Sequence, residues 1–295
     1  MKKWVTALVC IMMILFPLIG ATAEAKVYVN QTPPADWSER DLLRLTVFNT
    51  TTNDAMLLEC GGQTMIVDGG WQKWAGPLMR AYQAMGLIDE GGNPHVDRIF
   101  ISHPHDDHVL GVIKMVERGL TSDEYITNIP EKYKDTYHQQ ALKLMKKNNI
   151  SIHYLQQNEI IQMGNANLRV FWYSDWKDLN QASAVIHVEY GDATLLLTGD
   201  AVGAAQRGLL REVPTEYLKS DIMKVPHHAY NICVKEFLEA VDPQLTFATA
   251  RQRQIPKVVS QMKARNIALL CHNLGRIVLE TDGTEWYVRQ YRNEF

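Results

Sequence analysis

The hydrophobic pattern of the chain predicts a run of short strands, followed by an alternation of strands and helices. Three strands are expected first, at residues 42–48, 55–60 and 64–67. Gly61-Gly62 suits the tight turn of a hairpin between the second and the third. Residues 77–88 then have the spacing of an amphipathic helix, which leads into a buried strand at residues 99–101. The domain therefore opens as a meander and continues as strand and helix units.

The rest of the chain keeps this alternation. Helices are expected near residues 110–116, 133–144, 234–240 and 256–265. Strands are expected at residues 150–155, 168–173, 184–190, 193–197, 222–225 and 245–248, before a closing hairpin at Asp282-Gly283. Neither a sequence repeat nor a second linker interrupts the pattern. Residues 42–295 are therefore predicted to form one α/β domain, a four-layer αββα sandwich with two sheets between helices.

The first 25 residues predict a secretory signal peptide. Lys2 and Lys3 precede an apolar run over residues 4–20, and Ala23-Glu24-Ala25 offers a small-x-small cleavage site. A retained membrane anchor is the alternative, but the run is short for a bilayer span and is broken by Pro17. We expect a secreted or cell-envelope protein with no stable membrane span after cleavage. The mature chain would start with residues 26–41, which have no hydrophobic period and are predicted to be an exposed leader.

The charge balance is mildly acidic. The chain has 30 Lys and Arg against 33 Asp and Glu, and cleavage before Lys26 would leave 28 against 32. This balance lacks the global basic footprint of a protein that binds polyanions tightly. A local basic patch for nucleic acid stays open at Lys143 to Lys147 or at Arg251 and Arg253, with a solvated surface as the alternative.

Three cysteines would remain in the mature chain: Cys60, Cys233 and Cys271. A disulfide framework in an exported domain normally uses an even set, so the fold is not expected to depend on disulfides. One bridge or none is expected, and their pairing stays open. The chain has no CxxC pair that would indicate a cysteine metal site.

A dense group of ligand-type residues, His103-Pro104-His105-Asp106-Asp107-His108, follows the strand at residues 99–101. The first two imidazoles are two residues apart on an extended segment, so they project to the same side. Asp107 and His108 fall on the first turn of the next helix, where they can reach a second ion. Three His and two Asp at six consecutive positions are costly to bury unless a cation compensates them. We therefore expect a two-metal site, with a helix cap as the alternative role of Asp106.

Further ligands are expected where other strands end. Asp200 follows a buried strand through Thr198-Gly199 and suits a carboxylate that bridges both ions. His227 or His228 follows the next strand. Asp68 ends an earlier strand, where it could orient a ligand imidazole by hydrogen bonding or serve only as a turn residue.

In this order these residues resemble the motifs of the metallo-β-lactamase superfamily. The motifs are an Asp after an early strand, HxHxDH, a bridging Asp and a final His, and the resemblance runs from about Leu42 to the C-terminus. It implies a metallo-β-lactamase-like fold and a catalytic centre in which Asp107 and Asp200 take part. The metal ligands that it implies are His103, His105, Asp107, His108, Asp200 and His227. Asp68 would be an outer partner that orients a ligand, and His228 is a further candidate.

Three segments look most like the hydrolase domain of ComEC-type competence proteins and their stand-alone exported relatives. The segments are residues 102–108, 196–200 and 224–228. Phosphorylcholine esterases are similar in broad pattern. The resemblance implies a phosphodiester substrate, DNA included, in preference to a lactam.

The chain departs from that branch at several positions. Residues 48–55 keep only the ends of its Phe-x-Asp-Val-Gly-Gln-Gly-Asp-Ala segment, Ala229-Tyr230 replaces the usual Gly-Ser, and residues 254–256 replace Tyr-Gly-His-Pro. The middle metal-ligand His of the superfamily is also missing. Asn180, Ser183 or water would complete that coordination shell. His272 has no assigned role.

The expected function is that of an exported binuclear hydrolase that uses a hydroxide bridging two divalent ions. Zn²⁺ or Mn²⁺ suits the mixed His and carboxylate ligands, and no Ser or Cys nucleophile is needed. A phosphodiesterase, with nucleic acid as a possible substrate, is favoured. The alternatives are an esterase or lactonase for cell-surface or small-molecule substrates, phosphorylcholine esters among them, and a non-catalytic metal-binding protein.

Overall fold

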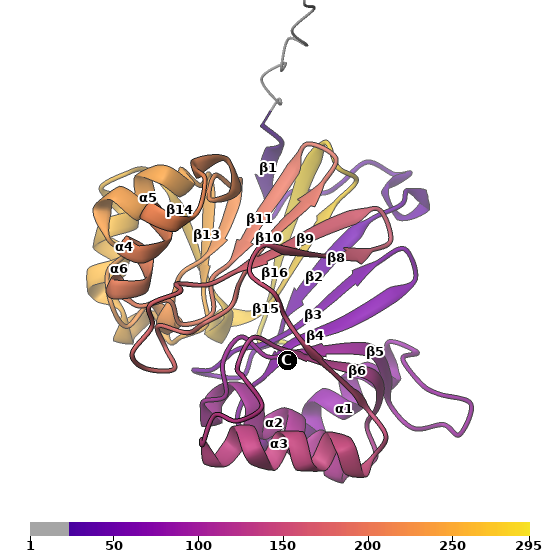
Figure 1. The fold of residues 1–295 in the computed structure, drawn as a ribbon. Coiled ribbons are helices and arrows are strands. Elements are labelled where there is room, and N and C mark those ends of the chain that lie inside the picture. The colour runs from indigo at the N-terminus through magenta and orange to yellow at the C-terminus, as the bar shows by residue number, and fades with distance from the viewer. Residues whose placement is uncertain (1–23) are drawn as a thin grey trace, which may run out of the picture.

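The computed structural model describes residues 24–295, which form two β-sheets packed face to face between two groups of helices (Figure 1). The signal peptide predicted at residues 1–25 lies almost entirely outside the described residues. One apolar core fills the space between the sheets, and a separate core lies under each group of helices. This arrangement confirms the predicted four-layer αββα sandwich.

The first sheet has nine strands in the order β1-β16-β15-β2-β3-β4-β5-β6-β7. Its strands are β1 (Lys26–Val29), β2 (Leu43–Val47), β3 (Ala55–Cys60), β4 (Gln63–Gly69), β5 (His95–Phe100), β6 (Thr121–Thr127), β7 (Ser151–Tyr154), β15 (Gly275–Thr281) and β16 (Glu285–Arg292). Strands β2, β3 and β4 form the predicted antiparallel meander, whereas β4 to β7 run parallel.

The second sheet has seven strands in the order β14-β13-β12-β11-β10-β9-β8. Its strands are β8 (Glu159–Met163), β9 (Ala166–Phe171), β10 (Val185–Tyr190), β11 (Ala193–Leu197), β12 (Ile222–Lys224), β13 (Leu245–Ala248) and β14 (Ala268–Cys271). Strands β11 to β14 are parallel, so their carboxyl ends meet at one edge of the sheet.

The helices divide between the outer faces of the two sheets, where they form separate groups in Figure 1. Helices α1 (Ala75–Ala84), α2 (Asp106–Glu117) and α3 (Thr136–Lys147) cover the first sheet, and α4 (Gly203–Glu212), α5 (Lys235–Val241) and α6 (Pro256–Lys263) cover the second. Helix α1 ends before the predicted residue 88 because Gly86 adopts a φ of 79° and stops the helical path. Among residues 24–295, no helix combines the length and apolar character needed to cross a bilayer.

Residues 26–41, predicted to be an exposed leader with nothing to dock it, pair with the edge of the first sheet, although most of their side chains are exposed or half-exposed. Strand β1 pairs in parallel with β16, and Trp37 is buried against the ring of Tyr287. Ala25 is also buried, and its carbonyl accepts a hydrogen bond from Gln244. The segment is too short to show a hydrophobic period by itself. It is held by backbone pairing at a sheet edge, which leaves little trace in the sequence.

Helix α2 packs unusually close to the end of β4. The N–H of Gly111 donates a 2.7 Å hydrogen bond to the carbonyl of Gly70. A Cβ atom at position 111 would lie 1.8 Å from the carbonyl oxygen of Gly69, so only glycine allows this approach. The contact sets the first turn of α2 beside Asp68.

Candidate metal centre

Four strand ends converge on one buried group of polar side chains. Asp68 lies near the end of β4, and residues 102–108 follow β5 into α2. In the second sheet, Asp200 follows β11 and the pair His227-His228 follows β12. Because carboxyl ends of neighbouring parallel strands meet at one edge, residues far apart in the sequence become neighbours here.

Asp68 fixes the orientation of His108. Its carboxylate accepts hydrogen bonds from the backbone N–H and the hydroxyl of Ser102, at 2.8 and 2.7 Å. Oδ2 of Asp68 also lies 2.8 Å from Nδ1 of His108. With Nδ1 engaged, the Nε2 atom of His108 points away from Asp68 and toward the other carboxylates of the site. This geometry fits the orienting role predicted for Asp68.

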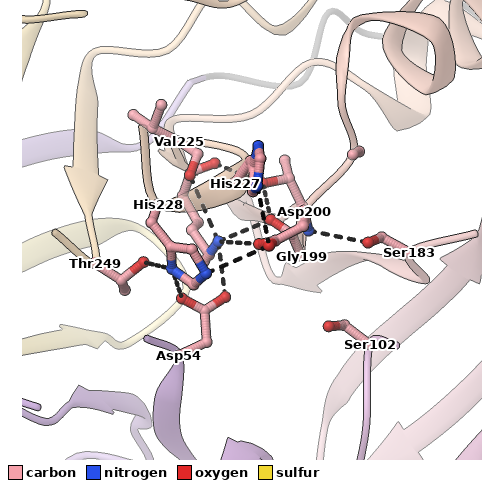
Figure 2. Close-up of polar contacts among 12 residues, drawn as sticks. Asp54, Ser102, Ser183, Gly199, Asp200, Val225, His227, His228 and Thr249 are labelled. Carbon is pink, nitrogen blue, oxygen red and sulfur yellow. Dashed lines mark hydrogen bonds and ion pairs between the residues drawn. The ribbon is translucent and has the colours of Figure 1, made fainter. Parts of the chain in front are cut away.

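Asp107, His108, Asp200 and His228 meet at their polar tips. Nε2 of His108 lies 3.3 Å from Oδ2 of Asp200 and 3.7 Å from Oδ1 of Asp107. Nε2 of His228 lies 3.3 Å from Oδ2 of Asp200 and 3.1 Å from Oδ2 of Asp107. Figure 2 shows His228 beside Asp200. One divalent ion could take ligand atoms from three of these side chains at once.

His103 and His105 form the other half of the site. Nε2 of His103 lies 3.0 Å from Nδ1 of His105 and 3.9 Å from Oδ2 of Asp200. His103 is fully buried, whereas His105 is partly exposed. We call the six side chains that meet here the ligand cluster: His103, His105, Asp107, His108, Asp200 and His228.

The two side chains predicted as substitutes for the missing His differ in their contacts. The hydroxyl oxygen of Ser183 accepts a 3.0 Å hydrogen bond from the N–H of Asp200 and lies 3.4 Å from Nδ1 of His103. Ser183 therefore braces both neighbours. The Oδ1 atom of Asn180 is buried with no hydrogen-bond partner among the described residues, so it remains free to bind a ligand.

The predicted ligand His227 and its alternative His228 both approach Asp200, and His228 lies deeper in the cluster. His228 is 1% exposed, whereas 27% of the His227 side chain is exposed and its Nε2 atom lies 4.0 Å from Oδ2 of Asp200. Nδ1 of His227 contacts Oδ1 of Asn231. Residues 227–229 all have a positive φ, of 51°, 50° and 62°, a conformation that costs non-glycine residues energy. The strained turn separates the two imidazoles, so that one faces the cluster and the other faces its rim.

The electrostatics of the cluster call for added positive charge. Burial alone would lower the pKa of His108, but Asp200 and Asp68 raise it well above its usual range. Burial likewise opposes a charged His228, yet Asp200 and Asp54 raise its pKa well above the usual value. Burial lowers the pKa of His103 well below the usual value, and the neighbouring His108 lowers it further. Protons or metal ions can supply the positive charge that the carboxylates attract.

The donor set fits divalent metal ions. Nε2 of His108, Nε2 of His228 and Oδ1 of Asp200 are buried without a hydrogen-bond partner among the described residues. Buried polar atoms are normally satisfied, so such a group of unsatisfied atoms on converging side chains indicates a ligand. Four carboxylates, of Asp54, Asp68, Asp107 and Asp200, contact His108 or His228, and the ammonium of Lys224 lies against two of them, Asp54 and Asp200. Divalent cations would offset the remaining negative charge.

Asp54 and Lys224 are site residues that the sequence analysis did not single out. Both are fully buried, and Nζ of Lys224 lies 2.8 Å from Oδ2 of Asp54. A signal was available, because Lys224 is the last residue of a strand whose other residues are apolar, directly before Val225-Pro226 and the histidines. A charged residue at such a position seldom lies in the core without a partner.

Other residues noted in the sequence lie outside the cluster. The Oδ1 atom of Asp106 accepts a 3.0 Å hydrogen bond from the N–H of Asp107, in the first turn of α2. The ring of His272 contacts the carbonyls of Phe48 and Thr51, so it holds the loop before Asp54. The three cysteines of the described residues, Cys60, Cys233 and Cys271, are buried and free.

Comparison with family models identifies a superfamily. The model of the metallo-beta-lactamase superfamily matches residues 50–243, which is more than half of the chain. The matched segment contains every residue of the ligand cluster.

Individual relatives are distant. A ribonuclease of Thermus thermophilus is 24% identical over 232 residues, which are 69% of this chain and 51% of that protein, so the chain spans about half the length of this relative. The metallo-beta-lactamase fold protein YhfI from Bacillus subtilis has a similar structure, with a TM-score of 0.53 at 13% identity over 82% of this chain and 100% of that one. A diphosphatase of the PhnP family gives a TM-score of 0.47 at 16% identity, over 81% of this chain and 98% of that one.

Proposed function

This chain belongs to the metallo-beta-lactamase superfamily, and we propose that it is an exported, binuclear phosphodiesterase that cleaves nucleic acid. The observation that carries the proposal is the ligand cluster, in which buried imidazole and carboxylate atoms lack hydrogen-bond partners among the described residues. The superfamily assignment alone supports a metal-dependent hydrolase. The number of ions, the substrate class and export are proposed beyond what superfamily membership supports.

The residues of the cluster divide into two sets of ligands. His103, His105 and Asp200 would hold one ion, and Asp107, His108, His228 and the shared Asp200 would hold the other. Mixed imidazole and carboxylate donors suit Zn²⁺ and also Mn²⁺. Ions bound there would supply Lewis acidity and a water molecule of lowered pKa. A binuclear site of this kind needs no Ser or Cys nucleophile.

Residues around the ligands would position the substrate. The Ser183 hydroxyl accepts a hydrogen bond from the N–H of Asp200, so it would hold that ligand in place instead of binding an ion. A coordination position on the ion would then stay open to the substrate. His227 lies at the rim with its Nε2 atom 4.0 Å from Asp200 Oδ2 and part of its ring exposed. We assign His227 Nε2 as the donor of a hydrogen bond to the phosphodiester.

Two features of the rim support nucleic acid as the substrate. Tyr230 is 50% exposed and its ring centroid lies 5.7 Å from that of His227, so it offers a face on which a base could stack. Arg251 and Arg253 line a pocket of about 410 Å³, and Arg251 follows two residues after Thr249, which contacts His228. Two residues span at most about 7 Å, so the backbone of Arg251 lies near the cluster, and its guanidinium suits a backbone phosphate. The ribonuclease relative is consistent with this substrate class.

An ester or lactone substrate is the second candidate. The observation in its favour is the apolar surface of the rim, where Tyr230 and Ile232 are both about half exposed. Such a surface would accept an acyl chain as readily as a base. The resemblance of residues 102–108 and 224–228 to ComEC-type hydrolase domains favours the phosphodiester.

The experiment is a metal analysis of the purified mature protein combined with a substrate screen. The screen contains single-stranded DNA and RNA, bis-nitrophenyl phosphate, nitrophenyl phosphorylcholine, a lactone and a β-lactam. We expect two divalent ions per chain and turnover of the phosphodiesters. Turnover of the lactam or lactone alone would refute the proposal. Export is checked separately by N-terminal sequencing of protein recovered outside the cytoplasm, with Lys26 expected as the first residue.

A further inference from the structure

The ammonium of Lys224 is anchored deep in the protein beside the ligand cluster. Lys224 is 0% exposed, and its Nζ atom donates a 2.8 Å hydrogen bond to the carbonyl of Gly199. Nζ also lies 2.8 Å from Oδ2 of Asp54 and 3.9 Å from Oδ1 of Asp200. A buried ammonium is costly unless it is paired, so these contacts must compensate its lost hydration.

The position of Lys224 bears on how Asp200 is presented to a metal ion. Nζ approaches Oδ1 of Asp200, whereas Oδ2 of the same carboxylate faces the Nε2 atoms of His108 and His228. Lys224 also holds the carbonyl of Gly199, the residue immediately before Asp200. The ammonium therefore restrains both the backbone and the carboxylate of one candidate ligand.

Asp54 lies on the opposite side of His228 from the ligand atoms. Its Oδ1 atom is 3.3 Å from Nδ1 of His228, and Nδ1 also lies 3.0 Å from the hydroxyl oxygen of Thr249 (Figure 2). Asp54 therefore places a buried carboxylate at Nδ1 of His228, as Asp68 does at Nδ1 of His108, while Thr249 makes the shorter contact with that nitrogen and Nε2 is left for the cluster. Such outer partners orient a ligand imidazole and raise its basicity.

The loop that carries Asp54 is fixed. Nδ2 of Asn53 donates a 2.6 Å hydrogen bond to the carbonyl of Thr50. Both ring nitrogens of His272 lie 2.9 Å from loop carbonyls, those of Phe48 and Thr51. Asp54 can therefore hold its two partners, His228 and Lys224, in a set geometry.

We propose that Asp54 and Lys224 form a positioning pair that sets Asp200 and His228 for metal binding. The proposal rests on the proposed metal centre and adds two residues on which metal affinity depends. Removing either partner leaves the other as an unpaired buried charge and releases the restraint on a ligand. Neither residue needs to touch the ion.

The test measures metal binding by four variants: Asp54→Asn, Lys224→Met, Lys224→Arg and the double variant Asp54→Asn with Lys224→Met. Dissociation constants of Zn²⁺ and Mn²⁺ are obtained by chelator competition with the metal-free protein, and bound metal is counted per chain. Loss of an outer partner of a ligand typically weakens metal binding about 10- to 100-fold, which is the effect expected for Asp54→Asn and Lys224→Met. Because the two residues act through each other, the double variant should lose less than the product of the single losses.

The control is Asp221→Asn, which removes a buried carboxylate that binds Thr194 and Trp286 away from the cluster. It should lower thermal stability and leave metal affinity unchanged. Asp54→Asn keeps the size of the side chain, so its metal affinity can be measured even if Lys224→Met does not fold. Wild-type affinity in a folded Asp54→Asn or Lys224→Met protein would overturn the pair and leave the metal centre standing. A wild-type protein that binds neither ion would overturn both proposals.

Discussion

Nδ1 of His108 lies 2.8 Å from Oδ2 of Asp68, in a fully buried contact between the end of β4 and the first turn of α2. The two residues are 40 positions apart in the sequence, and both contact the hydroxyl of Ser102, which lies 2.7 Å from Oδ2 of Asp68 and 3.5 Å from Nδ1 of His108. The contact determines which nitrogen of His108 faces the ligand cluster. An amide in place of the carboxylate would keep the shape of the side chain and remove its charge.

Asp68→Asn should weaken metal binding about 10- to 100-fold, as is usual when the outer partner of a ligand imidazole is lost. The measurement is the dissociation constant of Zn²⁺ for the metal-free variant. Asp221→Asn is the control, because it makes the same carboxylate-to-amide change at a buried position whose partners are Thr194 and Trp286. An Asp68→Asn protein that binds Zn²⁺ as tightly as Asp221→Asn would contradict the orienting role.

Alanine at Asp107 or at Asp200 should remove bound metal and phosphodiesterase activity together. Each carboxylate approaches two imidazoles of the cluster, and Asp200 is shared by both proposed ion sites. Asp106→Ala is the matched control, since its carboxylate only accepts a backbone N–H in the first turn of α2. It should cost about 0.3–1 kcal/mol of stability and no metal. Full activity in Asp200→Ala would refute the mechanism.

His228→Ala and His227→Ala should separate metal binding from catalysis. Because Nε2 of His228 lies inside the cluster, its loss should lower the metal content of the protein. His227 lies at the rim, so His227→Ala should keep its metal and lose about 100- to 1,000-fold in kcat, as is typical when a hydrogen-bond donor to the reacting group is removed. Metal per chain and kcat are measured on the same preparations. The opposite pattern would make His227 the ligand.

Tyr230→Ala and Arg251→Ala should raise KM for long substrates more than KM for short ones. Stacking on an aromatic ring contributes about 1–3 kcal/mol per base, so KM for a single-stranded oligonucleotide should rise roughly 5- to 150-fold in Tyr230→Ala. Bis-nitrophenyl phosphate does not extend along the rim, so its KM should change little. Lys257→Ala, an exposed cation on α6, is the control for general surface charge. Equal effects on both substrates would argue against a nucleic-acid rim.

The sequence predicted the sandwich because its buried strands are apolar runs with clear ends. Residues 55–60 and 245–248 were predicted with the bounds of β3 and β13. Strand β6 and helix α4 were not predicted. Strand β6 begins with Thr121-Ser122-Asp123-Glu124, and α4 contains two glycines and two arginines among its 10 residues. Both are held by their neighbours in the fold, and local composition does not show that context.

The candidate site was predicted only where its residues are adjacent in the sequence or resemble a motif. The density of ligands at residues 103–108 identified one half of it. Asp54 escaped notice because it follows a polar loop, and its partner Lys224 lies 170 positions away in another sheet. The choice between His227 and His228 depends on the strained turn at residues 227–229, since its left-handed backbone, and not the residue type, decides which ring faces inward.

Gly111→Ala should destabilise the protein and weaken its metal site, although alanine is the better helix former by about 1 kcal/mol. The new Cβ would lie 1.8 Å from the carbonyl oxygen of Gly69, a backbone atom that cannot move aside without shifting β4. We expect a loss of about 3 kcal/mol, at the upper end of overpacking costs, which corresponds to a decrease in Tm of roughly 6–12 °C.

Gly76→Ala in α1 is the matched control for that substitution. Its Cβ would meet only the ends of two arginine side chains, at 3.2 and 3.5 Å, which can swing away. Gly76→Ala should therefore raise the free energy of unfolding by about 0.4–1 kcal/mol. Because α2 carries Asp107 and His108 on its first turn, the clash at Gly111 should also lower Zn²⁺ affinity, whereas Gly76→Ala should not. A Gly111→Ala protein with the Tm of the Gly76→Ala variant would show that α2 does not depend on its close contact with β4.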